Sequence, residues 1–429
     1  MHIGIYINNE NISSVDCKNL LAGNPGIGGT EYCVLLLAQA YKMYYSNNKV
    51  TLFVAKQGIL PEVDNYVVVN GIDDLPAKAQ KEDVDVLVVS AVYNGIPLPQ
   101  SFFDDISAKK IKTILWGHNF YLNDFCNKIC KCEYAKANVF VGRQQYDRYI
   151  DHAVINKSTY IYNMYPETDE LHREKIQNHA VTYIGSLVPT KGFHVLAAVW
   201  KTILKEVPDA ALNVVGNGKL YGRNSKLGKY NIAEDSYEKQ FMSGLTDDEG
   251  NILPSVHFWG VLGVEKNDVI RNTCVGVVNP TGRTETFGIS ALDFESMSVP
   301  VVTIAKGGFL DTVLNEKTGL LYGHTDDFAK DIIMLLKNDK LNEQYGRDGV
   351  QLCKKFTPDK IIKEWNRLFL KVLNDEKMEY IEPDSFMETN LKKYRCLNRK
   401  IKNAIGVEYP ISVIGAESFA RNVLRRMGK

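Results

Sequence analysis

The hydrophobic residues of this chain form short continuous runs that alternate with longer, helix-like patterns. In the first half, β-branched apolar runs predict strands at 2–7, 50–55, 84–90, 111–117 and 138–142. The pattern then starts again and predicts strands at 181–186, 211–218, 256–260, 274–280 and 299–305. Helical patterns include 30–45, 191–207 and 357–373. Apolar runs without polar alternation are typical of parallel sheets that are buried on both faces.

This repeated order predicts an α/β protein with two Rossmann-like domains in tandem and a ligand in the cleft between them. We place the domains at 1–170 and 171–373, with a junction near 165–180, followed by a helical, basic extension at 374–429. Residues 219–254 interrupt the second domain as a long polar connection, which is predicted to be either functional or mobile.

Composition removes several classes of protein. Lys and Arg balance Asp and Glu at 51 each, so charge gives no support to nucleic-acid binding. No apolar run approaches the ~20 residues of a membrane span, and the N-terminus lacks a signal-peptide pattern, so a cytoplasmic location is expected. The cluster formed by Cys126, Cys130 and Cys132 lacks a zinc spacing and is interpreted as reduced thiols on a helix.

Candidate chemistry in the first half lies in loops near strands. The loop "GNPGIGG" contains Gly28 and Gly29 and leads into a helix, where phosphate could approach the backbone, although a glycine-rich turn is the alternative. His118 directly follows a strand, and the carboxyl ends of parallel strands face the ligand crevice. Asp83 and Asp85 form a D-x-D pattern but lead straight into a strand, so we interpret them as strand-entry carboxylates.

The second half offers a lysine and two acids in similar loops. Lys191 stands at a helix start, where a cation indicates a phosphate partner. Glu285 precedes a predicted helix at 286–298, and Asp293 lies eight residues later, about 12 Å along the axis. That spacing suits hydrogen bonds to the hexose and the ribose of a nucleotide sugar, with the diphosphate on the N–H groups of residues 286–289. The alternative is an N-cap acid and a solvent-facing helix acid.

The ordered set of these motifs resembles the retaining GT-B glycosyltransferases of family 4 over about residues 1–373. The matching stretches are "GIGGTE", "WGHN", "YIGSLVPTKG", "VVGNG", "FWG" and "TETFGISALDFESMSVPVV". The resemblance implies a GT-B architecture, with two facing Rossmann-like domains and an inter-domain cleft. It also implies metal-independent hexosyl transfer with retention, no cofactor, and a nucleotide-sugar donor, with UDP expected ahead of GDP. The expected acceptor is a glycan or lipid-linked glycan in cell-surface polysaccharide synthesis.

The resemblance also implies roles for individual residues. Glu285 matches the acid on the donor sugar, His118 the histidine near it, and Lys191 the cation on the diphosphate. The residues implied to bind the donor are Gly28, Gly29, Ser186, Thr286, Phe287, Gly288, Ile289 and Asp293. The family usually has Glu at position 293 and Arg at position 186. Arg283 or Arg223 could supply the missing cation; alternatively, the chain is a non-catalytic partner subunit that binds carbohydrate or nucleotide.

The C-terminal extension is strongly basic. Residues 391–429 contain ten Lys and Arg against Glu408 and Glu417, and apolar residues alternate with arginines near the end. Such a segment predicts peripheral contact with an anionic membrane at the inner face of the cell membrane. The alternative is a solvated helix that packs on the body through its apolar face, partly neutralised by the acidic stretch 375–388.

Overall fold

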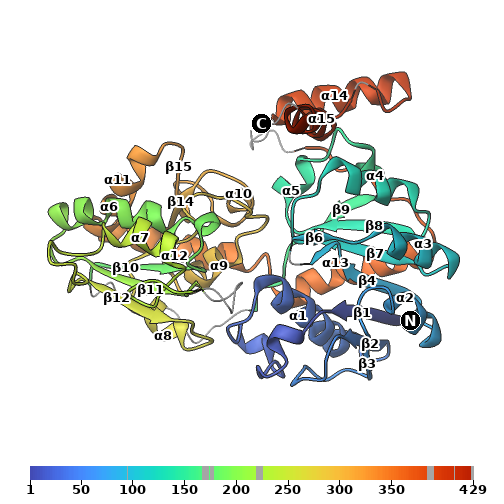
Figure 1. The fold of residues 1–429 in the computed structure, drawn as a ribbon, viewed down its shortest axis with the longest axis horizontal. Coiled ribbons are helices and arrows are strands. Elements are labelled where there is room, and N and C mark those ends of the chain that lie inside the picture. Colours follow the sequence, from blue (N-terminus) through green and yellow to red (C-terminus); the bar gives the residue numbers. More distant parts are fainter. Residues whose placement is uncertain are drawn as a thin grey trace. The chain divides into compact units, whose positions relative to one another are not determined.

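The computed structural model describes residues 1–93, 95–166, 173, 178–218, 226–383, 391–409 and 411–426. The chain forms two compact units (Figure 1). Unit 1 consists of residues 1–21, 30–164 and 358–429, and unit 2 of residues 22–29 and 165–357. The predicted domains are continuous segments of the sequence, whereas each compact unit combines separate segments. The predicted limits therefore remain predictions. Most of the predicted junction at 165–180 lies outside the described residues.

Unit 1 is built on a seven-stranded sheet in the order β3-β2-β1-β4-β7-β8-β9, with every pair parallel. The order reverses between β1 and β4, which makes this pair the switch point of the sheet. The strands are β1 (His2–Ile7), β2 (Lys49–Val54), β3 (Asn65–Val68), β4 (Val86–Ser90), β7 (Thr113–Gly117), β8 (Ala135–Phe140) and β9 (Ser158–Tyr160), beside a separate antiparallel pair, β5 (Val92–Tyr93) and β6 (Ile96–Pro97).

Helices complete unit 1. They are α1 (Gly29–Tyr44), α2 (Leu75–Lys81), α3 (Gln100–Ala108), α4 (Asn123–Lys131), α5 (Arg143–Asp147), α13 (Pro358–Leu373), α14 (Lys392–Ile405) and α15 (Val413–Arg426). The helix predicted at 357–373 follows unit 2 in the sequence but packs in unit 1 as α13. Trp365 of α13 is fully buried, with its ring centroid 4.7 Å from that of Trp116 on β7, and Phe369 meets Tyr41 of α1 at 5.0 Å. No helix among the described residues is both long and apolar enough to cross a bilayer.

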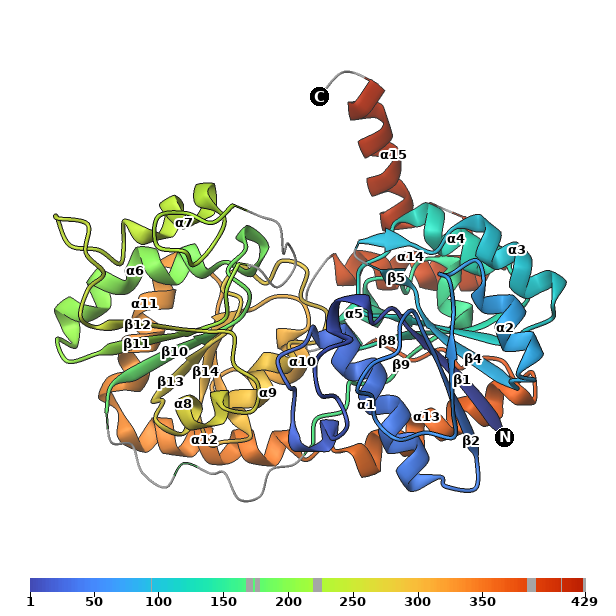
Figure 2. The same cartoon turned by 60° about the horizontal axis from the view of Figure 1, so that its bottom comes forward.

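Unit 2 has a six-stranded parallel sheet in the order β12-β11-β10-β13-β14-β15, again with a reversal, here between β10 and β13. Helices lie on both faces of this sheet (Figure 2). The strands are β10 (Ala180–Ile184), β11 (Ala211–Val215), β12 (Val256–Gly260), β13 (Val275–Val277), β14 (Val301–Ile304) and β15 (Gly319–Tyr322). The helices are α6 (Phe193–Glu206), α7 (Asp235–Met242), α8 (Lys266–Arg271), α9 (Ile289–Glu295), α10 (Phe309–Thr312), α11 (Thr325–Lys337) and α12 (Asp339–Cys353).

The structure confirms the α/β class and the two parallel-sheet, Rossmann-like parts. Part of the predicted polar connection at 219–254 forms a helix. Residues 219–225 lie outside the described residues, but the rest contains α7, whose Tyr237 and Phe241 pack into the core of unit 2. Glu238 fixes the preceding turn, because its carboxylate accepts hydrogen bonds from the N–H groups of Tyr230 and Ile232 at 2.8 and 2.9 Å.

Candidate active site

Lys191 and Glu285 meet at the switch point of unit 2. Lys191 follows β10 and Glu285 follows β13, the two neighbouring strands at which the order reverses. In open α/β sheets the crevice at this point is the usual ligand site. Lys191 Nζ lies 2.9 Å from Glu285 Oε2, and their side chains are 22% and 15% exposed. The two residues were predicted separately, and the structure brings them into one ion pair.

A glycine fixes the position of Lys191. The predicted helix start is wrong by two residues: Lys191 ends a 3₁₀ turn, Pro189–Lys191, and α6 begins only at Phe193. Gly192 between them has φ +70°, and a Cβ there would lie 2.6 Å from Cγ2 of Thr281. Thr281 also donates a hydrogen bond to the carbonyl of Thr190 at 3.1 Å. The loops after β10 and β13 are thus held together, because only glycine allows this turn and this approach.

Glu285 is held as a carboxylate. Besides Lys191, Asn279 donates to its Oε2 at 3.3 Å, and the Gly288 N–H donates to its Oε1 at 3.1 Å. Burial alone would raise the pKa of Glu285, but Lys191 and these hydrogen bonds outweigh it and hold the pKa below its usual value. An ionised carboxylate here is an acceptor only, suited to bind hydroxyl groups.

The helix after Glu285 is shorter than predicted. The sequence pattern indicated 286–298, whereas α9 spans Ile289–Glu295 and Gly288 precedes it with φ +87°. Thr286 and Phe287 therefore lie in the loop, both buried. Of the four N–H groups expected to receive a diphosphate, that of Gly288 donates to Glu285 instead.

Asp293 has its own lysine. Its Oδ2 lies 2.9 Å from Lys266 Nζ, and its Oδ1 accepts a hydrogen bond from the Tyr165 hydroxyl at 3.2 Å. The Asp293 side chain is 14% exposed, so the alternative of a solvent-facing helix acid is wrong. Lys266 and Asn279 were not predicted. Asn279 lies two residues after β13 and could have been found by the rule that strand ends face the ligand, whereas Lys266 had no such signal.

Ser186 and the glycine loop lie in the same unit. Ser186 follows β10 and is 6% exposed. Residues 22–29 also belong to unit 2, and a Cβ on Gly29, the first residue of α1, would lie 4.0 Å from Cγ2 of Ile289. Of the two cations considered in place of the usual arginine, Arg223 lies outside the described residues, and Arg283 is exposed in the loop before Glu285. Lys306 is a further candidate cation near the same loop. A Cβ built on Gly282, the residue before Arg283, would lie 3.0 Å from the Cβ of Lys306.

His118 lies in unit 1, directly after β7. Its ring centroid is 4.4 Å from that of Trp116. Burial lowers the pKa of His118 to about 3, against an opposing interaction with Asn163, so the imidazole is neutral at physiological pH.

The interpretation of the D-x-D pattern as strand-entry carboxylates is confirmed, because Asp85 accepts a hydrogen bond from the His2 N–H at the start of the sheet, at 2.7 Å. Within the described ranges no group of three or more His, Cys, Asp or Glu could hold a metal ion.

A second buried histidine adds a pH dependence of stability to unit 1. His152 Nδ1 accepts a hydrogen bond from the Val154 N–H at 3.0 Å and so caps a 3₁₀ turn, Ala153–Lys157. Burial, and then Lys402, lower its pKa to about 4. Protonation is therefore favoured in the unfolded chain. Stability should be full above the ordinary pKa of about 6.5 and fall as the pH drops, by about 2 kcal/mol at pH 5.

We expect the substitution His152→Asn to remove this part of the pH dependence, because asparagine caps without titrating in this range. Urea unfolding at pH 7 and pH 5 measures the difference for each protein. The control is His324→Asn, at the exposed start of α11, which should leave the difference between the two pH values unchanged. An equal pH dependence in the wild type and His152→Asn would contradict the prediction.

Comparison with known proteins identifies the region around this site. The family described as glycosyl transferases group 1 matches residues 164–351. An uncharacterized glycosyltransferase of Methanocaldococcus jannaschii is 25% identical over 215 residues, 50% of this chain and 53% of the relative. The capsular polysaccharide biosynthesis glycosyltransferase CapM of Staphylococcus aureus is 26% identical over 183 residues, 42% of this chain and 43% of the relative. The chain thus spans about half the length of these curated relatives.

Solved structures show the same fold over most of the chain. Sucrose-phosphate synthase from Thermosynechococcus elongatus has a TM-score of 0.64 at 16% identity, covering 87% of this chain and 99% of that one. Anabaena HepE, solved with UDP and glucose, has a TM-score of 0.62 at 14% identity, covering 86% and 100%. The protein is therefore one of the GT-B fold. Its residues 164–351, which contain both ion pairs, match the family model described as glycosyl transferases group 1.

Proposed function

We propose that this chain is a retaining hexosyltransferase that uses a nucleotide diphosphate sugar, UDP-linked ahead of GDP-linked. The acceptor is a lipid-linked or oligosaccharide glycan in cell-surface polysaccharide synthesis. The observation that carries the proposal is the Lys191–Glu285 ion pair at the switch point of unit 2, within the region that matches group 1. A cation beside an ionised acceptor suits a ligand that joins a diphosphate to a sugar.

In the transfer, the bond between the anomeric carbon and the diphosphate oxygen breaks, and its electron pair leaves with the diphosphate. The acceptor hydroxyl bonds to the same face of that carbon and gives its proton to the departing diphosphate oxygen. Lys191 stabilises the negative charge that develops on the diphosphate, and Glu285 accepts hydrogen bonds from the sugar. Asp293 binds the ribose. For His118 the resemblance implies a hydrogen bond to the sugar, and its neutral imidazole adds no charge.

The relatives support this proposal. CapM is described as a capsular polysaccharide glycosyltransferase, and HepE was solved both with UDP-glucose and with UDP and glucose.

One observation favours a second candidate, a non-catalytic partner subunit. Buried Ser186 stands where the resemblance expects a cation. If neither Arg283 nor Lys306 replaces that charge, the donor can bind without reacting.

The test is slow hydrolysis of nucleotide sugars by the full-length protein, scanned over UDP- and GDP-linked hexoses. We expect release of UDP from at least one UDP-hexose, with the same rate in EDTA because the proposed chemistry needs no metal. Thermal stabilisation by UDP is measured in parallel. Stabilisation by UDP or GDP without hydrolysis of any donor would favour the non-catalytic subunit, and neither effect would refute both candidates.

A further inference from the structure

The first of the two C-terminal helices, α14, packs on unit 1 through its basic face rather than its apolar face. We call residues 391–426 the C-terminal hairpin, which contains α14 and α15. One face of α14 carries Lys392, Arg395, Arg399 and Lys402, which are only 1–6% exposed. A helix brings residues three and four apart onto one side, so these four form a single basic stripe. The stripe faces unit 1 rather than solvent.

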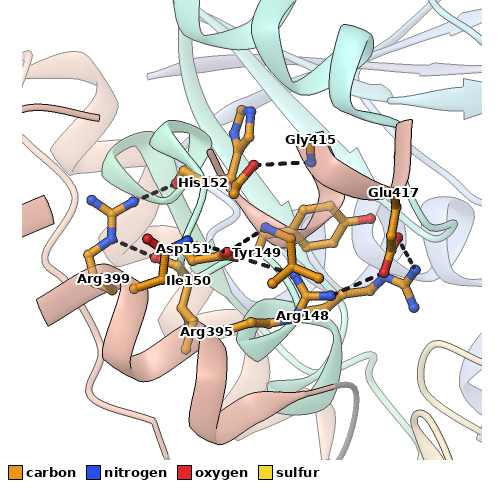
Figure 3. A network of polar contacts seen from close by, with 12 residues as sticks. Arg148, Tyr149, Ile150, Asp151, His152, Arg395, Arg399, Gly415 and Glu417 are labelled. Carbon is orange, nitrogen blue, oxygen red and sulfur yellow. Dashed lines mark hydrogen bonds and ion pairs between the residues drawn. The ribbon is translucent and has the colours of Figure 1, made fainter. Parts of the chain in front are cut away.

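Unit 1 supplies acids and carbonyl oxygens for this stripe. Arg395 pairs with fully buried Asp151 at 3.2 Å, and Lys392 pairs with Asp147 at 2.6 Å. Arg399 donates to the carbonyls of Ile150 and His152 at 2.6 and 2.9 Å, as Figure 3 shows. Both sequence alternatives placed the basic residues outward, which is wrong for these four residues of α14, whereas Arg421 and Arg425 of α15 are exposed. The positive charge of α14 is used mainly inside the protein.

The apolar face of α14 consequently points outward. Tyr394, Leu397, Ile401 and Ile405 lie along it and are 63%, 56%, 40% and 52% exposed. The link to α15 adds Tyr409 at 72%. The alternative of a helix packed through its apolar face is therefore wrong for α14. A contiguous exposed apolar surface of this kind marks an interaction site.

α15 adds a second set of exposed apolar residues. Its beginning is held on unit 1, where Ser412 to Gly415 are buried and the Val413 N–H donates to Asp151 at 2.6 Å. Beyond that turn Phe419, Val423 and Leu424 are exposed, and Figure 2 shows the helix standing away from the sheet of its unit. These three residues fall on one side of the helix at spacings of four and one. The hairpin thus presents two apolar helix faces and an aromatic tip.

The charges around this surface select its partner. The exposed charged side chains that border it include Lys393 and Lys400, two turns apart on α14, and Arg421 and Arg425 on α15. The two described carboxylates of the hairpin, Glu408 and Glu417, are already in ion pairs with arginines. A second copy of this chain would bring like charges together. An apolar stripe with tyrosines and a basic border fits an anionic bilayer surface.

We propose that the C-terminal hairpin lies on an anionic lipid bilayer through its apolar face, with the exposed lysines and arginines at the headgroups. The buried basic stripe of α14 does not contact lipid but anchors the hairpin to unit 1. This surface is independent of the proposed glycosyl transfer, because it lies outside the Lys191–Glu285 site. It would, however, bring an enzyme to lipid-linked acceptors.

Vesicle flotation tests the surface directly. Full-length protein is mixed with vesicles of phosphatidylcholine, with or without phosphatidylglycerol, at low and high salt. The test variant is Leu397→Gln with Ile401→Gln on the exposed face of α14. The matched control is Met43→Gln with Leu370→Gln, on α1 and α13 of the same unit, where the side chains are 62% and 47% exposed. Thermal unfolding confirms that both variants fold.

We expect the wild type and the control to float with phosphatidylglycerol vesicles at low salt, and less at high salt. The test variant should bind about tenfold more weakly, because two apolar side chains no longer enter the interface. Equal flotation of the test variant and the wild type would overturn the proposal. A wild type that does not float would overturn it as well. If light scattering then shows a wild-type dimer that the test variant lacks, the apolar face binds a second copy of the chain instead of lipid.

Discussion

Replacing Lys191 by alanine should lower the turnover number by about 10²- to 10³-fold, with a smaller effect on the Michaelis constant for the donor. The proposed role of this lysine is to stabilise charge that develops as the diphosphate leaves, and the loss of one such donor has that magnitude. An interaction that strengthens in the transition state affects turnover more than binding. The measurement is steady-state kinetics with whichever donor the hydrolysis scan identifies.

The same substitution should change the pH dependence of activity. Lys191 is the main influence that holds the pKa of Glu285 below its usual value, against the burial that raises it. Without Lys191 that pKa rises, so the acidic limb of the kcat/KM profile should move to higher pH. Lys191→Arg is the conservative comparison. It keeps a positive charge in place of the lysine that lies 2.9 Å from Glu285, so it should restore the position of that limb.

Lys266→Ala is the matched control in the same unit. Lys266 pairs with Asp293 at the same distance, 2.9 Å, but Asp293 is proposed to bind the ribose, and the ribose does not react. The substitution Lys266→Ala should therefore raise the Michaelis constant more than it lowers turnover. Unchanged turnover in Lys191→Ala, or the same profile for Lys191→Ala and Lys266→Ala, would refute the assigned role of Lys191.

The sheets could be predicted because their strands are buried on both faces. Such strands leave continuous apolar runs, as in Val86–Ser90, where every residue is buried. The strand β3 was missed because its four residues, Asn65–Val68, alternate between half-buried and exposed at the edge of the sheet. A continuous run of apolar residues therefore predicted central strands better than edge strands.

The candidate site could be predicted residue by residue but not as a set of contacts. Lys191 and Glu285 each follow a strand, which is visible in the sequence. Their ion pair depends on the close approach of Gly192 and Thr281, which are 89 positions apart and share no local pattern. The hydrogen bond from the Gly288 N–H to Glu285 likewise could not be predicted from the sequence, because a glycine allows a positive φ without requiring one.

The C-terminal hairpin shows why an amphipathic pattern does not reveal which face is buried. The sequence of α14 has a clear basic side and a clear apolar side, and the usual expectation buries the apolar one. The orientation is decided instead by Asp147 and Asp151, which lie some 240 residues earlier and had no place in the local pattern. Charged partners that are distant in sequence can thus reverse the orientation of a helix.

Replacing Asp151 by alanine should cost about 3–5 kcal/mol in the attachment of the hairpin, because it leaves the charge of Arg395 buried without its main partner. Asp151 is fully buried and accepts from Arg395 at 3.2 Å, from Asn398 at 3.0 Å and from the Val413 N–H at 2.6 Å. It therefore joins both helices of the hairpin to unit 1, and no other described acid holds both helix starts in this way.

This loss should appear as release of the hairpin rather than as unfolding of unit 1. The sheet of unit 1 is buried independently of α14, so the protein can avoid the cost by detaching the helix. Limited proteolysis and hydrogen exchange should then show cleavage and fast exchange within 391–426, while the Tm of the remainder changes little. The control is Glu417→Gln: Glu417 also pairs with Arg395, but at 3.5 Å and 41% exposed, and should cost at most about 1 kcal/mol. Equal protection of the hairpin in wild type and Asp151→Ala would show that the apolar contacts of Ile414 and its neighbours, not the buried charges, hold α14 and α15 in place.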